Sequence, residues 1–405
     1  MRTTARSGSR NAYYSTELVV ALEHVDEVAR TLQHLGVALG DVRHSDGLGL
    51  ALVPLRDDRA AAASVVAAAG LDQAPHVVGL DSDMDRLLVG VRDYFARRYA
   101  GWVPTLGKNR LLGDVIGSWK ISHGGTLFPE ATHQRLPERP SQPGRGVRVG
   151  VLDTSIAAHP WLAGGWVASS QDVWTASGPA PVVAGHATFV TGLVLQQAPG
   201  SVVEVRQVLS DEDGAADSWT VANEIVELGR AGVDILNLSL VCHTEDGQAP
   251  LALSTAVERL DPGTVVVAAA GNHGDTDEGD DENRRKPAWP AALDHVVAVG
   301  AADAQGTPAG FTPADVPWVD VLAPGVDVVS TYLEGDVELE EDAAPRRFEG
   351  FASWSGTSFA AASVSGAVAA RTRPGRVSAR EAWQQLRDSA SASAGEGPAF
   401  LPLDS

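Results

Sequence analysis

The sequence predicts an open α/β fold, in which helices cover both faces of a doubly wound parallel sheet, preceded by a small α+β module. Two patterns support this prediction. From Gly146 onward, short apolar runs alternate with helical stretches, as in proteins whose parallel strands are buried on both faces. Between residues 17 and 80, shorter segments follow the order β-α-β-β-α-β, which is typical of a ferredoxin-like, two-layer module. The length of 405 residues suits one large or two medium domains.

The elements of the N-terminal module are predicted from hydrophobic periodicity. Apolar residues recur at helical spacing over 25–35, and an alanine-rich helical stretch over 57–69 ends at Gly70. A further helix is expected over 82–99, because Ser82 is a candidate N-cap and Arg97 and Arg98 suit a helix C-terminus. Strands are expected at residues 17–22, 37–42, 48–55 and 76–80.

Changes in composition give the domain limits. We interpret residues 1–16 as a disordered tail, 17–100 as the module, and 101–145 as an irregular linker region with Gly and Pro. Residues 146–390 are expected to form the larger domain, and 391–405 a C-terminal tail. The larger domain is expected to contain strands at residues 147–152, 202–209, 233–240, 264–270, 295–301 and 319–322, with helices over 188–196, 220–229 and 249–260.

Composition also excludes several classes of protein. The formal net charge of −21 repels phosphates, so neither nucleic acid nor an anionic membrane is expected as a partner. The sequence has no run of 18 apolar residues and no secretory signal, which predicts a cytoplasmic location and leaves export by another route open. Cys242 is the one cysteine, so no intramolecular disulfide can form. The adjacent His243 does not complete a zinc-ligand pattern, and no metal site is predicted.

Three short segments of the larger domain carry residues suited to catalysis. Asp153 ends the apolar strand VGVLD, His186 opens the helix in GHATFVTG, and Ser358 follows a glycine turn in SGTSFAAASVSG. The carboxyl ends of buried strands are where α/β folds place their sites, and a helix N-terminus offers unpaired N–H groups beside the serine. Each segment alone also has a structural explanation, as a turn cap, a satisfied histidine or a serine cap on a buried helix.

Taken together, the segments place Asp, His and Ser in the chain order of subtilisin. The sequence resembles the subtilisin-like serine peptidases (subtilases, family S8) through VLDTSIAAHPWL, GHATFVTGLV, DILNLSL, VVVAAAGN, PAWPAALDHVVAVGA, VDVLAPGVDVVST and SGTSFAAASVSGAVAA. These stretches occur in the family's order and cover about residues 146 to 371. The resemblance implies a subtilisin-like fold for the larger domain and hydrolysis of peptide bonds through an acyl-enzyme.

The resemblance also implies residue roles. Ser358 aligns with the nucleophile, His186 with the general base and Asp153 with the aspartate that orients the imidazole. Asn272 aligns with the oxyanion-hole asparagine, which would act together with the Ser358 backbone N–H. No cofactor is implied for this chemistry.

Substrate binding is expected to follow the family's mode, in which an extended peptide pairs with two backbone edges. One edge would lie within residues 214–219, and the pocket for the residue before the scissile bond would lie close to the oxyanion asparagine. The residues expected to bind substrate, on the other edge and in that pocket, are Leu238, Ser239, Leu240, Val241, Ala269, Ala270 and Gly271.

The sequence departs from the family's usual pattern at several positions. Ala187 and Val241 stand where the family usually has glycine, and a larger side chain at the cleft floor predicts a narrower choice of substrate. Ala362 and Ser363 replace the usual proline and histidine of the serine helix, where a helix interior tolerates them.

Two acidic segments have more than one explanation. Residues 275–282 read DTDEGDDE, which we interpret as a solvated loop, with attraction of basic substrates or a structural calcium site as alternatives. Residues 335–342 are interpreted as a second solvated acidic insertion.

The N-terminal module is interpreted either as a propeptide-like domain that covers the active site until it is cleaved, or as a permanent accessory domain. For the whole chain, the predicted function is a serine endopeptidase that acts on a peptide or protein, with processing of one cognate precursor as a narrower form. The alternative is a non-catalytic or autoinhibited peptide-binding protein on the same scaffold. The sequence leaves the oligomeric state open.

Overall fold

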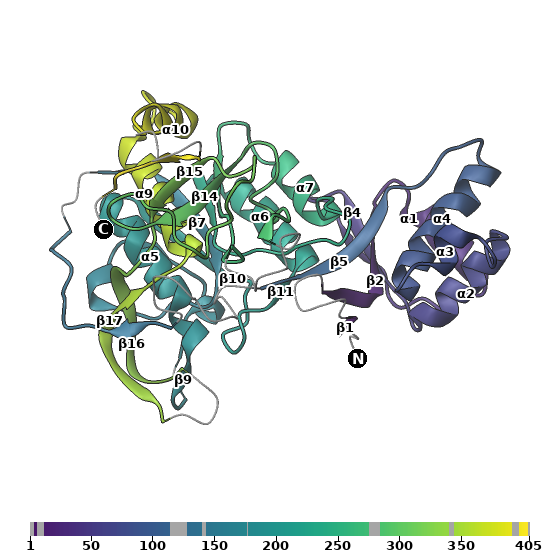
Figure 1. Ribbon diagram of the computed structural model, residues 1–405, viewed down its shortest axis with the longest axis horizontal. Helices are drawn as coiled ribbons and strands as arrows, with labels where there is room; N and C mark the ends of the chain where they lie inside the picture. The colour runs from purple at the N-terminus through teal and green to yellow at the C-terminus, as the bar shows by residue number, and fades with distance from the viewer. Residues whose placement is uncertain are drawn as a thin grey trace. The chain divides into compact units, whose positions relative to one another are not determined.

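The computed structural model describes residues 4–5, 12–113, 128–139, 143–175, 177–274, 284–339, 344–390 and 397–403. The chain divides into two compact units (Figure 1). The first contains Met1–Leu111 together with Asp217–Val226 and Gln248–Arg259, and the second contains the remainder. The N-terminal module therefore forms a unit together with two segments from the second half of the sequence. The acidic loop at 275–282 lies outside the described residues.

The first unit is built on an antiparallel sheet with the strand order β11-β5-β2-β4-β3. Its strands are β2 (Tyr13–Ala21), β3 (Arg43–Ser45), β4 (Leu50–Pro54), β5 (Leu106–Leu112) and β11 (Ala216–Asp217), and β1 (Thr4–Ala5) pairs with β2. The helices of the module are α1 (Val25–His34), α2 (Asp58–Ala68), α3 (Pro75–Val78) and α4 (Asp83–Arg98). Leu18 and Val20 of β2 share a core with Val28, Leu87 and Phe95 of these helices.

Polar contacts lie on the other face of this sheet. Asn109 donates to Glu17 at 2.7 Å and accepts from the Ser218 hydroxyl and the Trp219 N–H in the first turn of α6 (Ser218–Ala231). The helix α7 (Leu251–Glu258) also belongs to this unit, and a Cβ added at Gly107 of β5 would lie 3.4 Å from the Leu251 side chain.

Three expectations for this part of the chain were wrong. The strand expected at 76–80 is the helical turn α3, because Pro75 occupies its first turn. The last strand of the module is instead β5, inside the region expected to be irregular, where buried partners compensate its polar residues. The strand β2 begins at Tyr13, within the expected tail.

The second unit is built on an eight-stranded sheet, and all of its described strand pairs are parallel. The strand order is β18-β15-β14-β13-β12-β7-β10-β8. These strands are β7 (Arg148–Asp153), β8 (Trp166–Val167), β10 (Val202–Gln207), β12 (Ile235–Leu238), β13 (Val265–Ala269), β14 (Val296–Ala302), β15 (Val321–Pro324) and β18 (Ala399–Phe400). The predicted doubly wound α/β architecture is confirmed.

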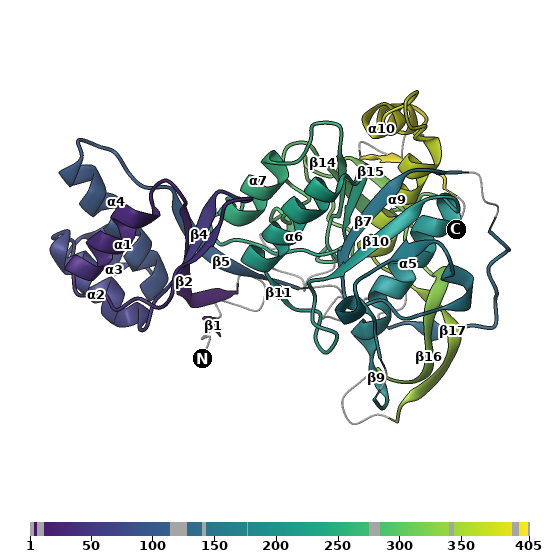
Figure 2. The ribbon, with the colours of Figure 1, turned by 180° about the vertical axis from the view of Figure 1, so that it is seen from behind.

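Helices cover both faces of this sheet, as Figure 2 shows from behind. On one face, Val149 and Val151 of β7 share a core with α5 (His186–Gln197) and α9 (Thr357–Arg371). Gly150, between them, faces Leu228 of α6 on the other side. The helix α10 (Ala379–Asp388) packs beside α9.

The remaining elements flank the large sheet. The antiparallel ribbon of β16 (Val328–Glu338) and β17 (Arg346–Trp354) also pairs with β6 (Glu130–Ala131) and β9 (Ala180–Pro181). Short 3-10 helices occupy Pro160–Leu162, Ser170–Asp172 and Val182–Gly185. Part of the expected C-terminal tail is structured, because β18 pairs with β15 and Leu401 is fully buried. Among the described residues, no helix has the length and apolarity that crossing a membrane requires.

Candidate active site

The three predicted catalytic residues occupy neighbouring element ends of the second unit. Asp153 is the last residue of β7, His186 is the first residue of α5, and Ser358 is the second residue of α9. The helix α9 begins after Gly356 and carries small side chains along a fully buried stretch. Small residues let α9 approach α5 closely, since a Cβ on Gly366 would lie 2.6 Å from the Val194 carbonyl oxygen.

Asp153 and His186 form a buried pair. The Nδ1 atom of His186 lies 2.8 and 2.9 Å from the two carboxylate oxygens of Asp153, and both side chains are 0% exposed. An ionised carboxylate only accepts hydrogen bonds, so Nδ1 donates the proton and Nε2 is left as the basic nitrogen. The backbone N–H of Thr154 also donates to Asp153 Oδ1, at 2.7 Å, which fixes the carboxylate.

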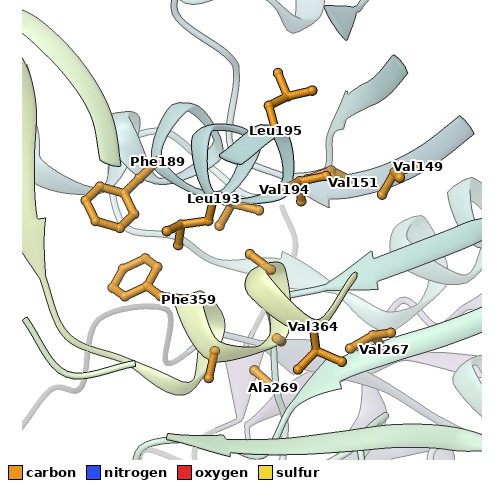
Figure 3. Close-up of a cluster of buried hydrophobic side chains, with 14 of the residues drawn as sticks. Val149, Val151, Phe189, Leu193, Val194, Leu195, Val267, Ala269, Phe359 and Val364 are labelled. Atoms are coloured by element: carbon orange, nitrogen blue, oxygen red, sulfur yellow. The ribbon is translucent and has the colours of Figure 1, made fainter. Parts of the chain in front are cut away.

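The basic nitrogen of His186 has no hydrogen-bond partner among the described residues, although it is buried. Ser358 is 3% exposed and makes no described hydrogen bond to this nitrogen. The rings of Phe359 and Trp354 lie 5.5 and 5.8 Å from the imidazole, measured between centroids. Figure 3 shows Phe359 opposite Phe189, between α9 and α5. The imidazole therefore lies beside two aromatic rings, with one acceptor that has no partner among the described residues, and catalytic hydrogen bonds often tighten only when substrate binds.

The side chain of Asn272 is fixed by Thr357, the residue that precedes Ser358. Its Oδ1 atom accepts hydrogen bonds from the backbone N–H and the hydroxyl of Thr357, both at 3.0 Å. The Thr357 hydroxyl in turn accepts from the Gly271 N–H at 3.1 Å. Because the amide oxygen is used in this way, the Asn272 NH₂ group remains as the donor. Sequence reasoning missed Thr357, whose position directly before Ser358 was the available signal.

The residues predicted to bind substrate lie at the ends of β12 and β13 and just beyond them. A chain of hydrogen bonds links β12 to Ser358. Asn237 donates to the Ser239 hydroxyl at 2.9 Å, and that hydroxyl donates to the Ser358 carbonyl at 3.0 Å. The seven predicted residues, namely Leu238, Ser239, Leu240, Val241, Ala269, Ala270 and Gly271, are all buried.

The predicted substrate edge at Val241 is paired with the chain itself. Gly113 donates its N–H to the Val241 carbonyl at 2.9 Å, and Val241 donates to the Gly113 carbonyl at 3.4 Å, as an antiparallel bridge. The other predicted edge includes Ala216–Asp217, which form β11 beside β5. The chain's own residues thus take part in the backbone pairing expected of a substrate.

The structure also places the other residues that the sequence singled out. Ala187 lies in the first turn of α5, and Ala362 and Ser363 are buried within α9. Cys242 is buried and pairs through its backbone with Trp289. Among the described residues, no group of three or more His, Cys, Asp or Glu is arranged to hold a metal ion.

Comparison with known sequences agrees with this geometry. The family model described as "Subtilase family" matches residues 144–400. The chain belongs to the subtilase family. It is 30% identical over 256 residues to a thermophilic serine proteinase of Bacillus sp. strain AK1, covering 60% of this chain and 57% of that protein. It is 32% identical over 237 residues to subtilisin BL of Lederbergia lenta, covering 56% of this chain and 76% of that protein.

A solved structure extends the comparison of folds. Fervidolysin from Fervidobacterium pennivorans superposes with a TM-score of 0.62 at 16% identity, covering 98% of this chain and 61% of that chain. This likeness concerns the fold. The thermophilic proteinase is matched over less than two thirds of its length.

Proposed function

We propose that this subtilase is a serine endopeptidase that uses Asp153, His186 and Ser358 as its catalytic triad and Asn272 in its oxyanion hole. The observation that carries the proposal is the buried contact of His186 Nδ1 with the Asp153 carboxylate, which leaves Nε2 as a base without a hydrogen-bond partner among the described residues. A serine hydroxyl is a weak nucleophile near neutral pH and needs such a base. Family membership supports the same chemistry.

In the proposed reaction, Ser358 Oγ attacks the carbonyl carbon of the scissile peptide bond while His186 Nε2 accepts the hydroxyl proton. Asn272 Nδ2 and the Ser358 backbone N–H stabilise the oxyanion. His186 then gives the proton to the leaving amine as the C–N bond breaks, which leaves an acyl-enzyme. Water attacks the ester, with His186 as base, and releases the acid product and the serine. Asp153 holds the imidazole and stabilises its protonated form throughout.

We further propose that the substrate is a specific precursor peptide and that the N-terminal module is propeptide-like. The pairing of Gly113 with Val241 supports a cleft that the chain itself covers, because a peptide that binds by strand addition needs the same backbone groups. Gly113 lies in the region that follows the module and belongs to the second unit. The isopropyl group of Val241 also stands where the family usually has glycine, which favours a restricted cleft. An accessory module that remains attached is the alternative.

The second candidate is an autoinhibited or non-catalytic peptide-binding protein. The enclosure of the His186 Nε2 atom and the pairing at Val241 favour it. Incubation of the full chain with casein and with a peptide library, followed by mass spectrometry, separates the two functions. Cleavage by wild type and none by Ser358→Ala supports the peptidase. Cleavage by neither protein, with retention of bound peptides, supports the binding protein, and indiscriminate digestion of casein contradicts a dedicated processing role.

A further inference from the structure

A carboxylate outside the proposed triad lies close to it. Asp211 is half-buried in the turn that follows β10, whose last residue, Gln207, is the register partner of Asp153. The same loop is attached to the catalytic aspartate, because the backbone N–H groups of Val208 and Leu209 donate to the Asp153 carbonyl at 2.9 and 3.0 Å. Neither family resemblance nor sequence periodicity points to Asp211.

Asp211 accepts hydrogen bonds from the turn that follows Asp153. Its Oδ1 atom accepts from the Ser155 backbone N–H at 2.8 Å, and its Oδ2 atom accepts from the Ser155 hydroxyl at 2.7 Å. Gln207 Nε2 donates to the same Oδ2 at 2.8 Å. Ser155 follows Thr154, which holds the Asp153 carboxylate through its own N–H. The two aspartates therefore accept hydrogen bonds from consecutive backbone N–H groups of one turn.

The Thr154 side chain connects this turn to the general base. Its hydroxyl accepts a hydrogen bond at 3.1 Å from the backbone N–H of Ala187, which directly follows His186. A displacement of the turn would therefore move both the carboxylate that orients the imidazole and the start of α5.

Within the part of the chain that the structure describes, no cation forms an ion pair with Asp211. Its three donors are all neutral, and the charged group that acts on it is Asp153, which opposes its ionisation. Burial also raises the pKa of Asp211, while the hydrogen bonds from Ser155 and Gln207 act in the opposite direction. Two carboxylates without a cation are costly to hold near one another. Such an arrangement becomes favourable when a positive charge forms beside them.

We propose that Asp211 is a positioning residue, which holds the turn after Asp153 and adds its negative charge to stabilise the protonated His186 that forms during catalysis. The proposal rests on the proposed peptidase function for its consequence in catalysis. The effect of the Asp211 charge on His186 can be measured without substrate and without turnover.

The remaining charged groups around the site determine what a measurement would report. His186 faces Asp153 and two aromatic rings, those of Trp354 and Phe359. Asp172 lies beside Gln207, whose N–H donates to it at 3.1 Å, and Arg206 pairs with Glu204 along β10. Glu212 and Asp213, in the same turn as Asp211, are exposed. A negative charge near an imidazole favours the protonated form, so removing one lowers the pKa of His186.

The decisive experiment is a pH titration of His186 by NMR in the full chain. The protein carries ¹³C-labelled histidine and Ser358→Ala, which prevents self-digestion, and the signal is assigned with His186→Ala. Asp211→Asn keeps the size of the side chain, and the Ser155 hydroxyl can reverse its hydrogen bond to fit it. We expect the pKa of His186 to fall by about 0.5 unit in Asp211→Asn.

Two control variants separate charge from geometry. Glu212→Gln removes a charge from the same turn but from an exposed position, and should shift the pKa of His186 by less than half as much because solvent screens it. Ser155→Ala keeps the Asp211 charge and removes one hydrogen bond, so it should leave the titration in place. An unchanged titration in Asp211→Asn, or an equal shift in Glu212→Gln, overturns the proposal.

The rate of reaction with a fluorophosphonate adds the catalytic readout, on proteins that retain Ser358. The acid limb of its pH profile should move to lower pH in Asp211→Asn, whereas a merely structural role would lower the rate equally at every pH. If the wild type does not react at Ser358, the proposed peptidase function fails, while the NMR titration still decides the role of Asp211. If the wild type reacts and the acid limb of Asp211→Asn does not move, the proposal about Asp211 fails and the peptidase function stands.

Discussion

Each compact unit contains a buried polar cluster, and the two clusters differ in how completely their hydrogen bonds are satisfied. In the first unit, Asn109 donates to Glu17 at 2.7 Å and to Asp217 at 3.3 Å, and accepts from Ser218 and the Trp219 N–H. In the second unit, Asp153 and His186 are equally buried. There the imidazole Nε2 atom has no partner among the described residues.

The difference indicates what each cluster does. Asn109 uses all of its hydrogen-bonding capacity, so its cluster joins β5 to the start of α6 and has nothing left for a ligand. A buried acceptor without a partner costs stability, and proteins retain such groups mainly where they function. The Asn109 cluster therefore fits a structural role, and the unpartnered Nε2 atom of His186 fits the proton transfer that we propose for it.

The largest effect is expected from a variant that reverses the tautomer of His186. Asp153→Asn places an amide beside His186 Nδ1, which favours the tautomer with the proton on Nε2 and removes the base. We expect the rate of peptide hydrolysis to fall about 10⁴-fold, with little change in the thermal unfolding temperature. Asp320→Asn is the control, because this exposed aspartate also accepts from a backbone N–H, that of Ala298, and lies outside the proposed triad. An equal loss of activity in both variants would contradict the role of Asp153.

The next largest effect is expected on stability, in the Asn109 cluster of the first unit. Asn109→Leu leaves the buried oxygens of Glu17 and Asp217 without a donor that they now share, and should lower the free energy of unfolding of the full chain by roughly 3 kcal/mol. Urea unfolding measures the change. Asn223→Ala, which breaks a partly buried bond to Ser45, should cost about 1 kcal/mol. Equal stability of Asn109→Leu and wild type would show that the cluster is not structural.

A smaller effect is expected at the oxyanion hole. Thr357→Val retains the shape of the side chain and the backbone bond to Asn272 but removes the hydroxyl that donates to it. Asn272 should then be held less firmly, and kcat should fall about tenfold with KM nearly unchanged. Thr357→Ser keeps the hydroxyl and should retain most of the activity. A change in KM alone would argue that Thr357 acts on substrate binding.

The smallest effect is expected on the pH dependence of stability, through His159. Burial lowers the pKa of His159, whose Nδ1 accepts from the Trp161 N–H at 3.1 Å. The unfolded chain therefore binds more protons than the folded one below about pH 6.5, and stability decreases as the pH falls through that value. His159→Asn keeps an acceptor for Trp161 and should weaken the pH dependence of urea unfolding between about pH 7.5 and 5.5. An identical dependence in both proteins would show that His159 does not contribute.

The contrast between the clusters also explains what could be predicted from sequence. The positions of Asp153, His186 and Ser358 at element ends were predicted because each stands in a short segment whose pattern is local. The apolar runs of the parallel sheet were predicted for the same reason. Polar strands such as β5 were not predicted. Lys108, Asn109 and Arg110 are residue types common in loops, and only their partners in the fold explain their burial.

The remaining features depend on contacts that no local pattern reveals. Asn109 meets Ser218 across more than 100 positions of sequence, and Gly113 meets Val241 at a similar separation. Asp211 and Ser155 are 56 positions apart. Such pairs are determined by the order of strands in the sheets, which brings the ends of β7 and β10 together. Residue types alone do not contain this information.

The most direct test of the whole account is the intact mass of the full chain after reaction with a serine-reactive fluorophosphonate, with Ser358→Ala as the control. One adduct is expected on the wild type, mapped to Ser358 by peptide analysis, and none on the variant. Adducts on both proteins, or none on the wild type under conditions where it remains folded, would contradict the claim that His186 activates Ser358.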